Sequence, residues 1–286
     1  MPELPEVQAL VDFLDVRLPG LAVADVEVGS VAVLKTYDPP PQALAGSIVD
    51  SVSRHGKFLD VDVDGLHLVF HLARAGWLRW SDALAATRIR PGKSPIALRV
   101  RMSDGSGFDL TEAGTKKGLA VYLVADPAMV PGVAALGPDP LAQTFTREVF
   151  GSLLAGRSKQ IKGLLRDQSV IAGIGNAYSD EILHVAKMSP FATAAKLDEA
   201  AVDRLYDALR TTLARAVLAA SGKPAADLKD AKRGGMRVHG RAGQPCPECG
   251  DVVREVSFAD SALQYCATCQ TGGKPLADRR LSRLVK

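Results

Sequence analysis

No part of this sequence is apolar for anything near the ~18 consecutive residues that mark a membrane-spanning helix, so we expect no membrane span. The first residues, Met-Pro-Glu-Leu-Pro-Glu, lack a basic segment followed by an apolar one, which predicts that no secretory signal is present. We therefore expect a cytoplasmic protein. No internal repeat is evident either, so nothing predicts a solenoid.

Neither sign of charge is in large excess, and aromatic residues are scarce. The net charge is +3, charged residues make up 23% of the chain and aromatic residues 5%. So mild a charge bias neither identifies nor excludes a nucleic-acid partner. The segment 274–286 is locally basic, with Asp278 as its single acidic residue. A solvated tail and a phosphate-binding tail are both compatible with it.

Cysteine is confined to one short segment. The four cysteines form two pairs, Cys246-Pro-Glu-Cys249 and Cys266-Ala-Thr-Cys269. Two CxxC pairs at this separation are typical of a zinc site, because each turn presents two thiolates. Disulfides suit a secreted protein instead, and a redox CxxC usually occurs alone. We therefore predict one structural Zn²⁺ per chain, which stabilises a β-hairpin with its turn at residues 259–261.

The length of 286 residues predicts two domains, and the apolar content of 47% is enough for a sizeable core. Apolar spacing predicts a helix over residues 5–17. Alternating apolar segments follow, and two of their turns, Asp64-Gly65 and Asp104-Gly105, are strong hairpin signals. Residues 1–130 are thus expected to form a β-sandwich led by one helix.

A Pro- and Gly-rich stretch separates this sandwich from a predominantly helical part. The longest predicted helix there ends at Gly222, and a polar, glycine-rich segment then leads to the cysteines. The predicted fold class is α+β. The expected divisions after the sandwich are a helical domain over 131–235, a zinc finger over 236–270 and a basic tail over 271–286.

A short glycine turn, Ile-Ala-Gly-Ile-Gly-Asn at residues 171–176, lies between two predicted helical stretches. Backbone N–H groups at such a turn and at the following helix N-terminus suit a phosphate, and Asn176 adds a side-chain donor. Lys159 and Lys162 lie just upstream. An ordinary interhelical turn explains the same residues, so both interpretations stay open for this segment alone.

Pro2 follows the initiator methionine, whose removal would leave a free secondary amine with a pKa of about 8. The neutral fraction of such an amine can attack an electrophilic sugar carbon and form an iminium. Glu3 beside it can act as a general acid or base, and Glu6 lies one helical turn further on. A proline and acidic residues that merely begin a helix account for the same pattern.

Four motifs, in the same order, resemble those of the formamidopyrimidine-DNA glycosylase and endonuclease VIII family. They are the N-terminal Met-Pro-Glu-Leu-Pro-Glu-Val, Arg-His-Gly-Lys-Phe-Leu at 54–59, the segment 171–181 and the entry to the cysteines at 238–246. The resemblance implies a β-sandwich domain followed by a helical domain that carries a helix–two-turn–helix motif and a Cys₄ zinc finger.

The resemblance also implies a base-excision-repair DNA glycosylase with AP lyase activity, acting as a monomer on damaged DNA in a bacterial-type cytoplasm. Pro2 would be the nucleophile at C1′, Glu3 would assist opening of the sugar ring, and Lys57 would donate a proton or bind phosphate. The target base must leave the stack to be reached. The implied DNA contacts are Glu6, His71, Arg74, Lys162, Asn176 and Gln264.

Two sandwich segments depart from the family pattern. Arg74 stands where the branch specific for oxidised purines often has a Met that fills the gap left by the flipped base. Residues 112–118 lack that branch's Arg and Phe, although Lys116 and Lys117 keep positive charge there.

Two departures also occur near the finger. Ser261 replaces an Arg that grips phosphate, a role that would pass to Gln264 or to the basic tail. The segment before Val238 is short where the purine branch covers an extruded 8-oxoguanine. The departures together predict a broader or different range of lesions.

Two other functions fit part of the sequence. A damaged-DNA or abasic-site binding protein with weak or lost glycosylase activity is consistent with the departures, but it leaves Pro2, Glu3 and Lys57 unexplained. A zinc-ribbon interaction module on an unrelated enzyme is consistent with the cysteines alone.

Overall fold

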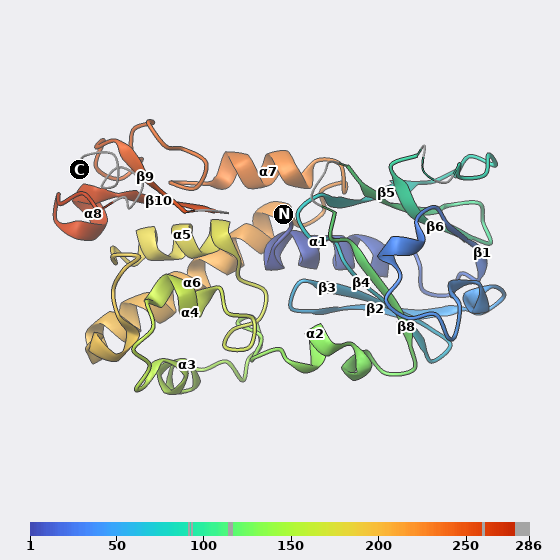
Figure 1. The fold of residues 1–286 in the computed structure, drawn as a ribbon, viewed down its shortest axis with the longest axis horizontal. Coiled ribbons are helices and arrows are strands. Elements are labelled where there is room, and N and C mark those ends of the chain that lie inside the picture. The colour runs from blue at the N-terminus through green and yellow to red at the C-terminus, as the bar shows by residue number, and fades with distance from the viewer. Residues whose placement is uncertain (91, 93, 114–116, 259–260, 278–286) are drawn as a thin grey trace. The chain divides into compact units, whose positions relative to one another are not determined.

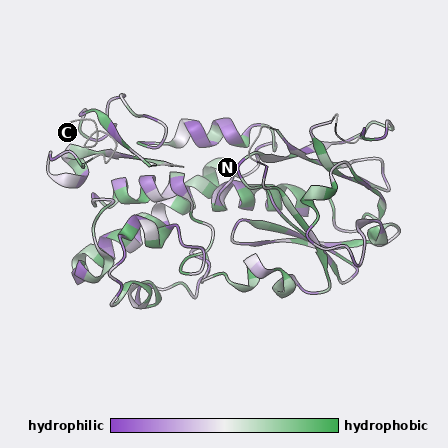
Figure 2. Cartoon of the chain, viewed as in Figure 1, coloured by the Kyte–Doolittle hydropathy of each residue, from purple (hydrophilic) through white to green (hydrophobic). Residues whose placement is uncertain are grey.

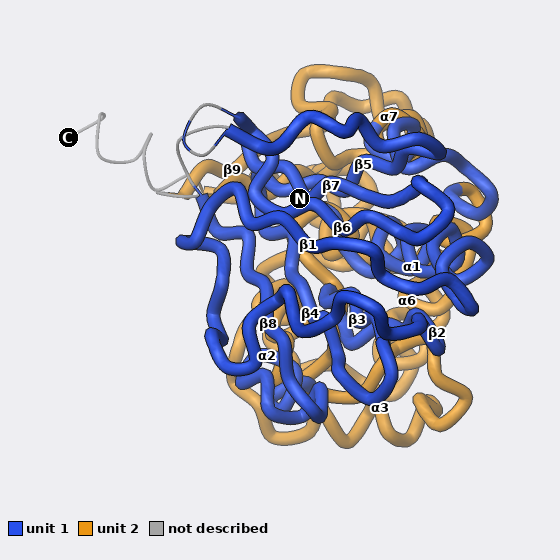
Figure 3. Tube along the Cα trace, turned by 90° about the vertical axis from the view of Figure 1, so that its right-hand side faces the viewer, with its two compact units in different colours: residues 1–136, 220–229 blue, residues 137–219, 230–286 orange. Residues whose placement is uncertain are grey.

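The computed structural model describes residues 1–286 apart from 91, 93, 114–116, 259–260 and 278–286. The chain divides into two compact units, which Figure 3 shows in different colours. Unit 1 comprises residues 1–136 and 220–229, and unit 2 comprises residues 137–219 and 230–286. The short segment 220–229 therefore belongs to unit 1, although the residues on both sides of it belong to unit 2.

Unit 1 is a sandwich of two four-stranded antiparallel sheets, preceded by helix α1 (Leu4–Asp15) (Figure 1). One sheet has the order β1-β6-β7-β5 and the other β2-β3-β4-β8, and their apolar side chains form one continuous core. The predicted helix-led sandwich is thus confirmed. The strands are β1 (Val23–Val28), β2 (Val49–His55), β3 (Phe58–Val63), β4 (Leu66–His71), β5 (Gly76–Ser81), β6 (Ile96–Met102), β7 (Gly107–Glu112) and β8 (Ala120–Val124).

The predicted β3–β4 hairpin shows how the sequence sets the register. Asp64 and Gly65 both have positive φ, 53° and 77°, as a two-residue type I′ turn requires. The turn pairs Val63 with Leu66, and the same register places Phe58 opposite His71 at the far end of the hairpin. A shift of one residue would expose the core face of β3, because successive side chains alternate between faces.

Short helices surround the strands of unit 1. Helix α2 (Pro131–Ala134) and the 3₁₀ turn η3 (Pro127–Met129) flank Val130, which is buried against Val69 and Val124 of the second sheet. Gly132 lies so close to Phe58 that a Cβ would be 2.6 Å from the ring. The remaining 3₁₀ turns of this unit are η1 (Val31–Val33) and η2 (Pro41–Leu44).

The segment 220–229 completes unit 1. Leu228 is fully buried in the core that α1 and the strands share. Trp77 on β5 donates its indole N–H to the carbonyl of Ala225 over 3.1 Å, and the Lys229 ammonium lies 4.4 Å from the centre of the Trp77 ring. A buried indole needs a hydrogen-bond acceptor, and this distant segment supplies it. Helix α7 (Leu228–Gly235) begins here and is mostly hydrophilic after Leu228 (Figure 2).

Unit 2 is built on helices. The long predicted helix is confirmed as α6 (Glu199–Ala220), and Gly222 just beyond it has a φ of +71°. The apolar faces of these helices form a second core that includes Phe150, Ile161 and Ile182. The other elements are α3 (Arg147–Leu154), α4 (Ile161–Leu165), α5 (Asn176–Val185) and the 3₁₀ turn η4 (Ala194–Lys196).

The cysteine segment of unit 2 forms the expected hairpin, β9 (Val253–Ser257) and β10 (Ala262–Cys266), followed by helix α8 (Ala267–Thr271). Residues 259–260 of the predicted turn and residues 278–286 of the basic tail lie outside the described residues. Across the part of the chain that the structure describes, every helix is too short or too polar to cross a membrane.

Candidate functional site

The start of α1 holds the first group of predicted site residues. Glu3 is the residue at which the helix is capped, and its backbone N–H donates to the Glu6 carboxylate over 2.8 Å. Pro2 is buried, and Glu3 and Glu6 are each 2% exposed. This local bond fixes the first turn of the helix. Two carboxylates are therefore held in a dry environment next to Pro2.

Contacts along α1 show which end of the sheet Pro2 and Glu3 occupy. Asp15, at the end of α1, accepts a hydrogen bond from the backbone of Val52, whereas Gln8 accepts one from the Arg54 guanidinium. The helix therefore runs antiparallel to β2. Its N-terminus lies toward the β2–β3 turn, which Gly56 and Lys57 form (Figure 1).

Lys57 and His71 lie together at that end of the sheet. Lys57 is 7% exposed, and His71 pairs with the neighbouring Phe58 across the hairpin, with ring centres 4.8 Å apart. Burial, and secondarily the charge of Lys57, lowers the pKa of His71 to about 4. The backbone N–H of Ala73 donates to His71 Nδ1 over 3.2 Å. The neutral ring therefore carries its proton on Nε2 and can act as a donor there.

The two sandwich segments that depart from the family pattern lie side by side. Arg74 is exposed in a tight turn in which a Cβ on Gly76 would lie 2.2 Å from the Leu72 carbonyl oxygen. The Glu112 carboxylate accepts hydrogen bonds from the backbone N–H groups of Gly118 (2.6 Å) and Leu119. These bonds join the two ends of the second segment. A Cβ on Gly118 would lie 3.3 Å from Ala73. Lys116 lies outside the described residues.

In unit 2, the glycine turn leads directly into α5. The Gln168 side chain holds this turn, since its amide oxygen accepts from Gly173 and its amide nitrogen donates to the Ile174 carbonyl. Asn176 is the first residue of α5, and its Nδ2 donates to the Ala262 carbonyl on β10 over 2.8 Å. An amide nitrogen carries two hydrogens, so one remains to donate to a ligand. The turn, the helix start and the hairpin thus meet at Asn176.

Lys162 has a buried position beneath this turn. It is 6% exposed, and its ammonium forms an ion pair with the fully buried Asp180 and a 3.2 Å hydrogen bond to Ser179. Asp180 also accepts from the His239 ring at 2.8 Å. This ion pair joins α4, which carries Lys162, to α5, which carries Asp180, and removing either partner would leave an uncompensated buried charge. The direct DNA contact of Lys162 remains a prediction.

Gln264 also has protein partners. Its Nε2 donates to Glu255 on the adjacent strand over 2.6 Å, and its backbone N–H donates to Asp180 over 3.3 Å. Its Oε1 is buried and without a partner among the described residues. An orphan oxygen cannot bind a phosphate oxygen, because both are acceptors. The phosphate role predicted for Gln264 therefore rests on the second hydrogen of an amide that is already engaged.

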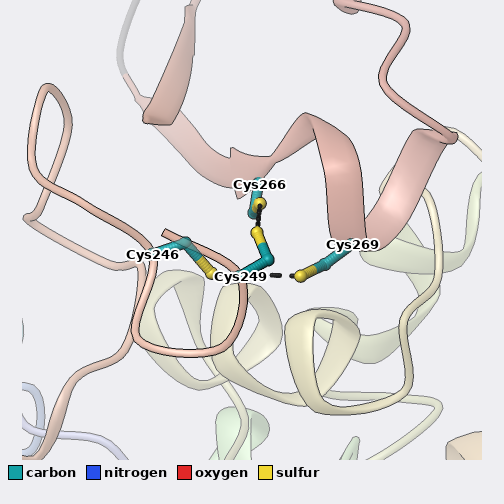
Figure 4. A group of neighbouring side chains, drawn as sticks. All are labelled: Cys246, Cys249, Cys266 and Cys269. Carbon is teal, nitrogen blue, oxygen red and sulfur yellow. Dashed lines mark hydrogen bonds between the residues drawn. The ribbon is translucent and has the colours of Figure 1, made fainter. Parts of the chain in front are cut away.

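The four cysteines converge in the finger (Figure 4). Their Sγ atoms all lie within 4.8 Å of one another, with Cys246–Cys269 at 3.9 Å and Cys249–Cys266 at 3.3 Å. Tetrahedral Zn–S bonds of about 2.3 Å require S–S separations of roughly 3.8 Å. The donor set therefore fits one Zn²⁺, as the spacing predicts.

Three family models match successive parts of the chain. The formamidopyrimidine-DNA glycosylase N-terminal domain matches residues 1–117, the formamidopyrimidine-DNA glycosylase H2TH domain matches residues 136–225, and the zinc finger found in FPG and IleRS matches residues 243–272. The chain belongs to the formamidopyrimidine-DNA glycosylase family.

Two relatives of the chain support its assignment to this family. A formamidopyrimidine-DNA glycosylase from Symbiobacterium thermophilum is 34% identical over 98% of this chain and 93% of its own length. An uncharacterised formamidopyrimidine-DNA glycosylase-like protein from Mycobacterium tuberculosis is 60% identical over 56% of this chain and 99% of its own length.

Solved structures of the family have the same fold. The Lactococcus lactis glycosylase bound to DNA with an AP site superposes with a TM-score of 0.81 at 25% identity, covering 94% of this chain and 99% of that one. MutM in complex with DNA containing carbocyclic 8-oxo-G gives 0.83 at 26% identity, covering 94% of this chain and all of that one.

Within this family framework, α5 carries buried polar residues to which the sequence alone assigned no role. Glu181 is 3% exposed and accepts N–H bonds from Arg237, Val238 and His239 at 2.7 to 3.0 Å. Burial raises the pKa of Glu181, and the three donors oppose that rise. Three donors on one carboxylate fix the chain where it enters the finger. In the sequence, the polar residues on an otherwise apolar face of this helix were the signal that could have indicated these buried contacts.

His184, one turn further along α5, is the other residue that the sequence did not reveal. It is 1% exposed, and its Nε2 lies 3.2 Å from Cys246 Sγ. Burial is the main cause that lowers the pKa of His184 to about 4, with the charges of Arg237 and Lys187 adding to it. A histidine outside both CxxC pairs gives no spacing signal for a contact with the zinc centre.

Proposed function

We propose that this protein is a base-excision-repair DNA glycosylase with AP lyase activity, acting through a Schiff base on Pro2. The observation that carries the proposal is the burial of Pro2 and Glu3 at the end of the sheet that also holds Lys57 and His71. Membership of the family supports it. DNA-bound relatives with an AP site or a lesion support damaged DNA as the substrate.

In the proposed reaction, the neutral Pro2 amine attacks C1′ of the damaged nucleotide, and the base leaves with its bonding electrons and a proton. Ring opening gives an iminium between Pro2 and C1′. The iminium makes the C2′ proton acidic, so a base can remove it and the 3′ phosphate can leave. Water then hydrolyses the iminium and frees Pro2.

The side chains around Pro2 have matching roles. Glu3 lies next to the amine and exchanges protons with the sugar as its ring opens. Glu6 holds the backbone of Glu3 in place through the 2.8 Å bond, so it positions the helix start. Lys57 supplies a positive charge or a proton near the leaving groups. The neutral His71 ring offers its Nε2 proton to a DNA oxygen without adding charge.

The remaining predicted contacts bind DNA or support the residues that bind it. Asn176 donates its second amide hydrogen to a backbone phosphate, together with N–H groups at the α5 start. Lys162 supports this turn through Asp180, and Gln264 fixes the adjacent strand. On unit 1, the exposed Arg74 contacts the DNA where the target base has left the stack.

Borohydride trapping on DNA with an abasic site tests the nucleophile. Wild-type protein is expected to form a covalent adduct that maps to its N-terminal peptide. Lys57→Met, which removes the other buried amine at this end of the sheet, is expected to keep the adduct. Pro2→Gly is expected to lose most of it, and undiminished trapping by this variant would exclude Pro2.

Glu3→Gln separates base removal from trapping. We expect it to trap a preformed abasic site but to release a damaged base far more slowly. If wild-type protein binds abasic-site DNA tightly and forms no adduct, the protein is a damage-binding relative without catalysis. A lesion panel would then identify what it recognises.

A further inference from the structure

His184 is the one histidine among the described residues for which a contact with a cysteine of the zinc centre is found. Its Nε2 lies 3.2 Å from Cys246 Sγ, and both residues are buried, at 1% and 3% exposure. The four thiolates already fill a tetrahedron, so a fifth ligand is not needed. A contact of this length instead matches a hydrogen bond between a ring nitrogen and a sulfur.

The surroundings of the ring decide which nitrogen carries the proton. Nδ1 of His184 is buried and has no hydrogen-bond partner among the described residues. With the proton on Nδ1, the ring would bury an unpaired N–H and direct a nitrogen lone pair at an anionic sulfur. With the proton on Nε2, the ring donates to that sulfur and leaves only a lone pair unpaired. The second arrangement avoids burying an unmatched donor.

We propose that His184 is an outer-shell partner of the zinc centre, in which its Nε2–H donates to the Cys246 thiolate and ties zinc binding to the position of α5. A hydrogen bond to a metal-bound thiolate stabilises the negative sulfur and holds it in its binding rotamer. In this arrangement His184 contacts a zinc ligand and acts through it, so it is a positioning residue.

Both ends of α5 are thereby fixed to the finger. At the helix start, Asn176 donates to the Ala262 carbonyl on β10. In the middle, Glu181 holds the chain at residues 237–239, and at the end His184 meets Cys246. The helix that presents Asn176 is therefore attached directly to a zinc ligand. Loss of zinc is expected to loosen the turn at Asn176.

Three full-length variants separate the hydrogen bond from packing. His184→Phe keeps a ring of similar size but removes the donor, and His184→Gln keeps a side-chain N–H at a similar distance along the side chain. Ile182→Val is the matched control, because Ile182 is fully buried on the same helix in the apolar core. Zinc affinity is measured by chelator competition. The thiolate-to-metal charge-transfer band is measured after Co²⁺ substitution.

We expect His184→Phe to weaken zinc binding about 10- to 100-fold, as loss of an outer-shell partner typically does. Its Co²⁺ charge-transfer band should move to longer wavelength, because an unprotected thiolate gives up an electron more easily. His184→Gln should recover most of both properties, and Ile182→Val should leave both unchanged.

Wild-type affinity and an unmoved band in His184→Phe would overturn the proposal. Equal losses in His184→Phe and His184→Gln would also overturn it, because a side-chain N–H at this position would then make no difference to zinc binding. If His184→Phe does not fold, the Co²⁺ charge-transfer band of His184→Gln is compared with that of Ile182→Val. Nearly equal band positions support the proposal, and a His184→Gln band at clearly longer wavelength overturns it. A Cys246→Ser variant that keeps wild-type zinc affinity would mean that His184 is itself a ligand, contrary to the proposal.

Discussion

Acidification is expected to destabilise unit 1 through His71. Burial and the charge of Lys57 lower the pKa of this ring from 6.5 to about 4 in the folded protein. Between these two values the unfolded chain binds a proton at His71 and the folded chain does not. The stability that the neutral ring contributes is therefore complete above the unfolded pKa and is lost as the pH falls toward the folded one.

The expected loss follows from the size of this shift. Each unit of pKa difference corresponds to about 1.4 kcal/mol, so acidification from about pH 7.5 to 4.5 should lower the free energy of unfolding by roughly 2 to 3 kcal/mol through His71. His71→Gln is the comparison variant, because its side chain does not titrate. Carboxyl groups titrate in both proteins, so their effects cancel in the difference.

Urea unfolding followed by tryptophan fluorescence reports on unit 1, which contains both tryptophans of the chain, Trp77 and Trp80. The wild type should lose more stability than His71→Gln by the stated amount. Parallel pH profiles for the two proteins, within about 0.5 kcal/mol, would refute a half-buried neutral His71, since that difference lies within ordinary extrapolation error.

Three further outcomes are expected. Gly76→Ala should cost about 2 to 4 kcal/mol of stability, because its Cβ would lie 2.2 Å from the Leu72 carbonyl oxygen, and thermal unfolding checks this. Cys249→Ser should lose its zinc and, with it, DNA affinity, and a metal assay that finds about one zinc per chain would contradict this. Asn176→Ala should weaken DNA binding by about 1 to 2 kcal/mol while leaving the circular dichroism spectrum intact. Unchanged affinity of Asn176→Ala would remove its phosphate role.

Local chemistry made much of the fold predictable from the sequence. Asp64-Gly65 can form only a narrow set of turns, so it fixed both the hairpin and its register. The two CxxC pairs likewise predicted a tetrahedral thiolate site, because few other arrangements satisfy that spacing. In both cases the residues that decide the structure are neighbours in sequence.

Long-range partners could not be predicted in this way. The sequence placed Lys162 near the glycine turn, yet its buried pairing with Asp180 depends on how two helices pack. The contact of His184 with Cys246 joins residues 62 positions apart. Likewise, the hydrogen bond from Trp77 to the Ala225 carbonyl joins residues 148 positions apart, and no local sequence pattern indicates it. Burial of polar groups is decided by packing, which composition and periodicity do not describe.

The placement of segment 220–229 has a consequence for how the protein is made. Trp77 and its neighbours are synthesised early, but the carbonyl that accepts the indole proton belongs to Ala225. By the time this residue leaves the ribosome, residues 137–219 of unit 2 have already been synthesised. Domains generally fold as units during synthesis, in order from the N-terminus. The sandwich of unit 1 therefore lacks the segment 220–229 until helix α6 has been synthesised. Until then, the indole N–H of Trp77 lacks the acceptor that Ala225 provides.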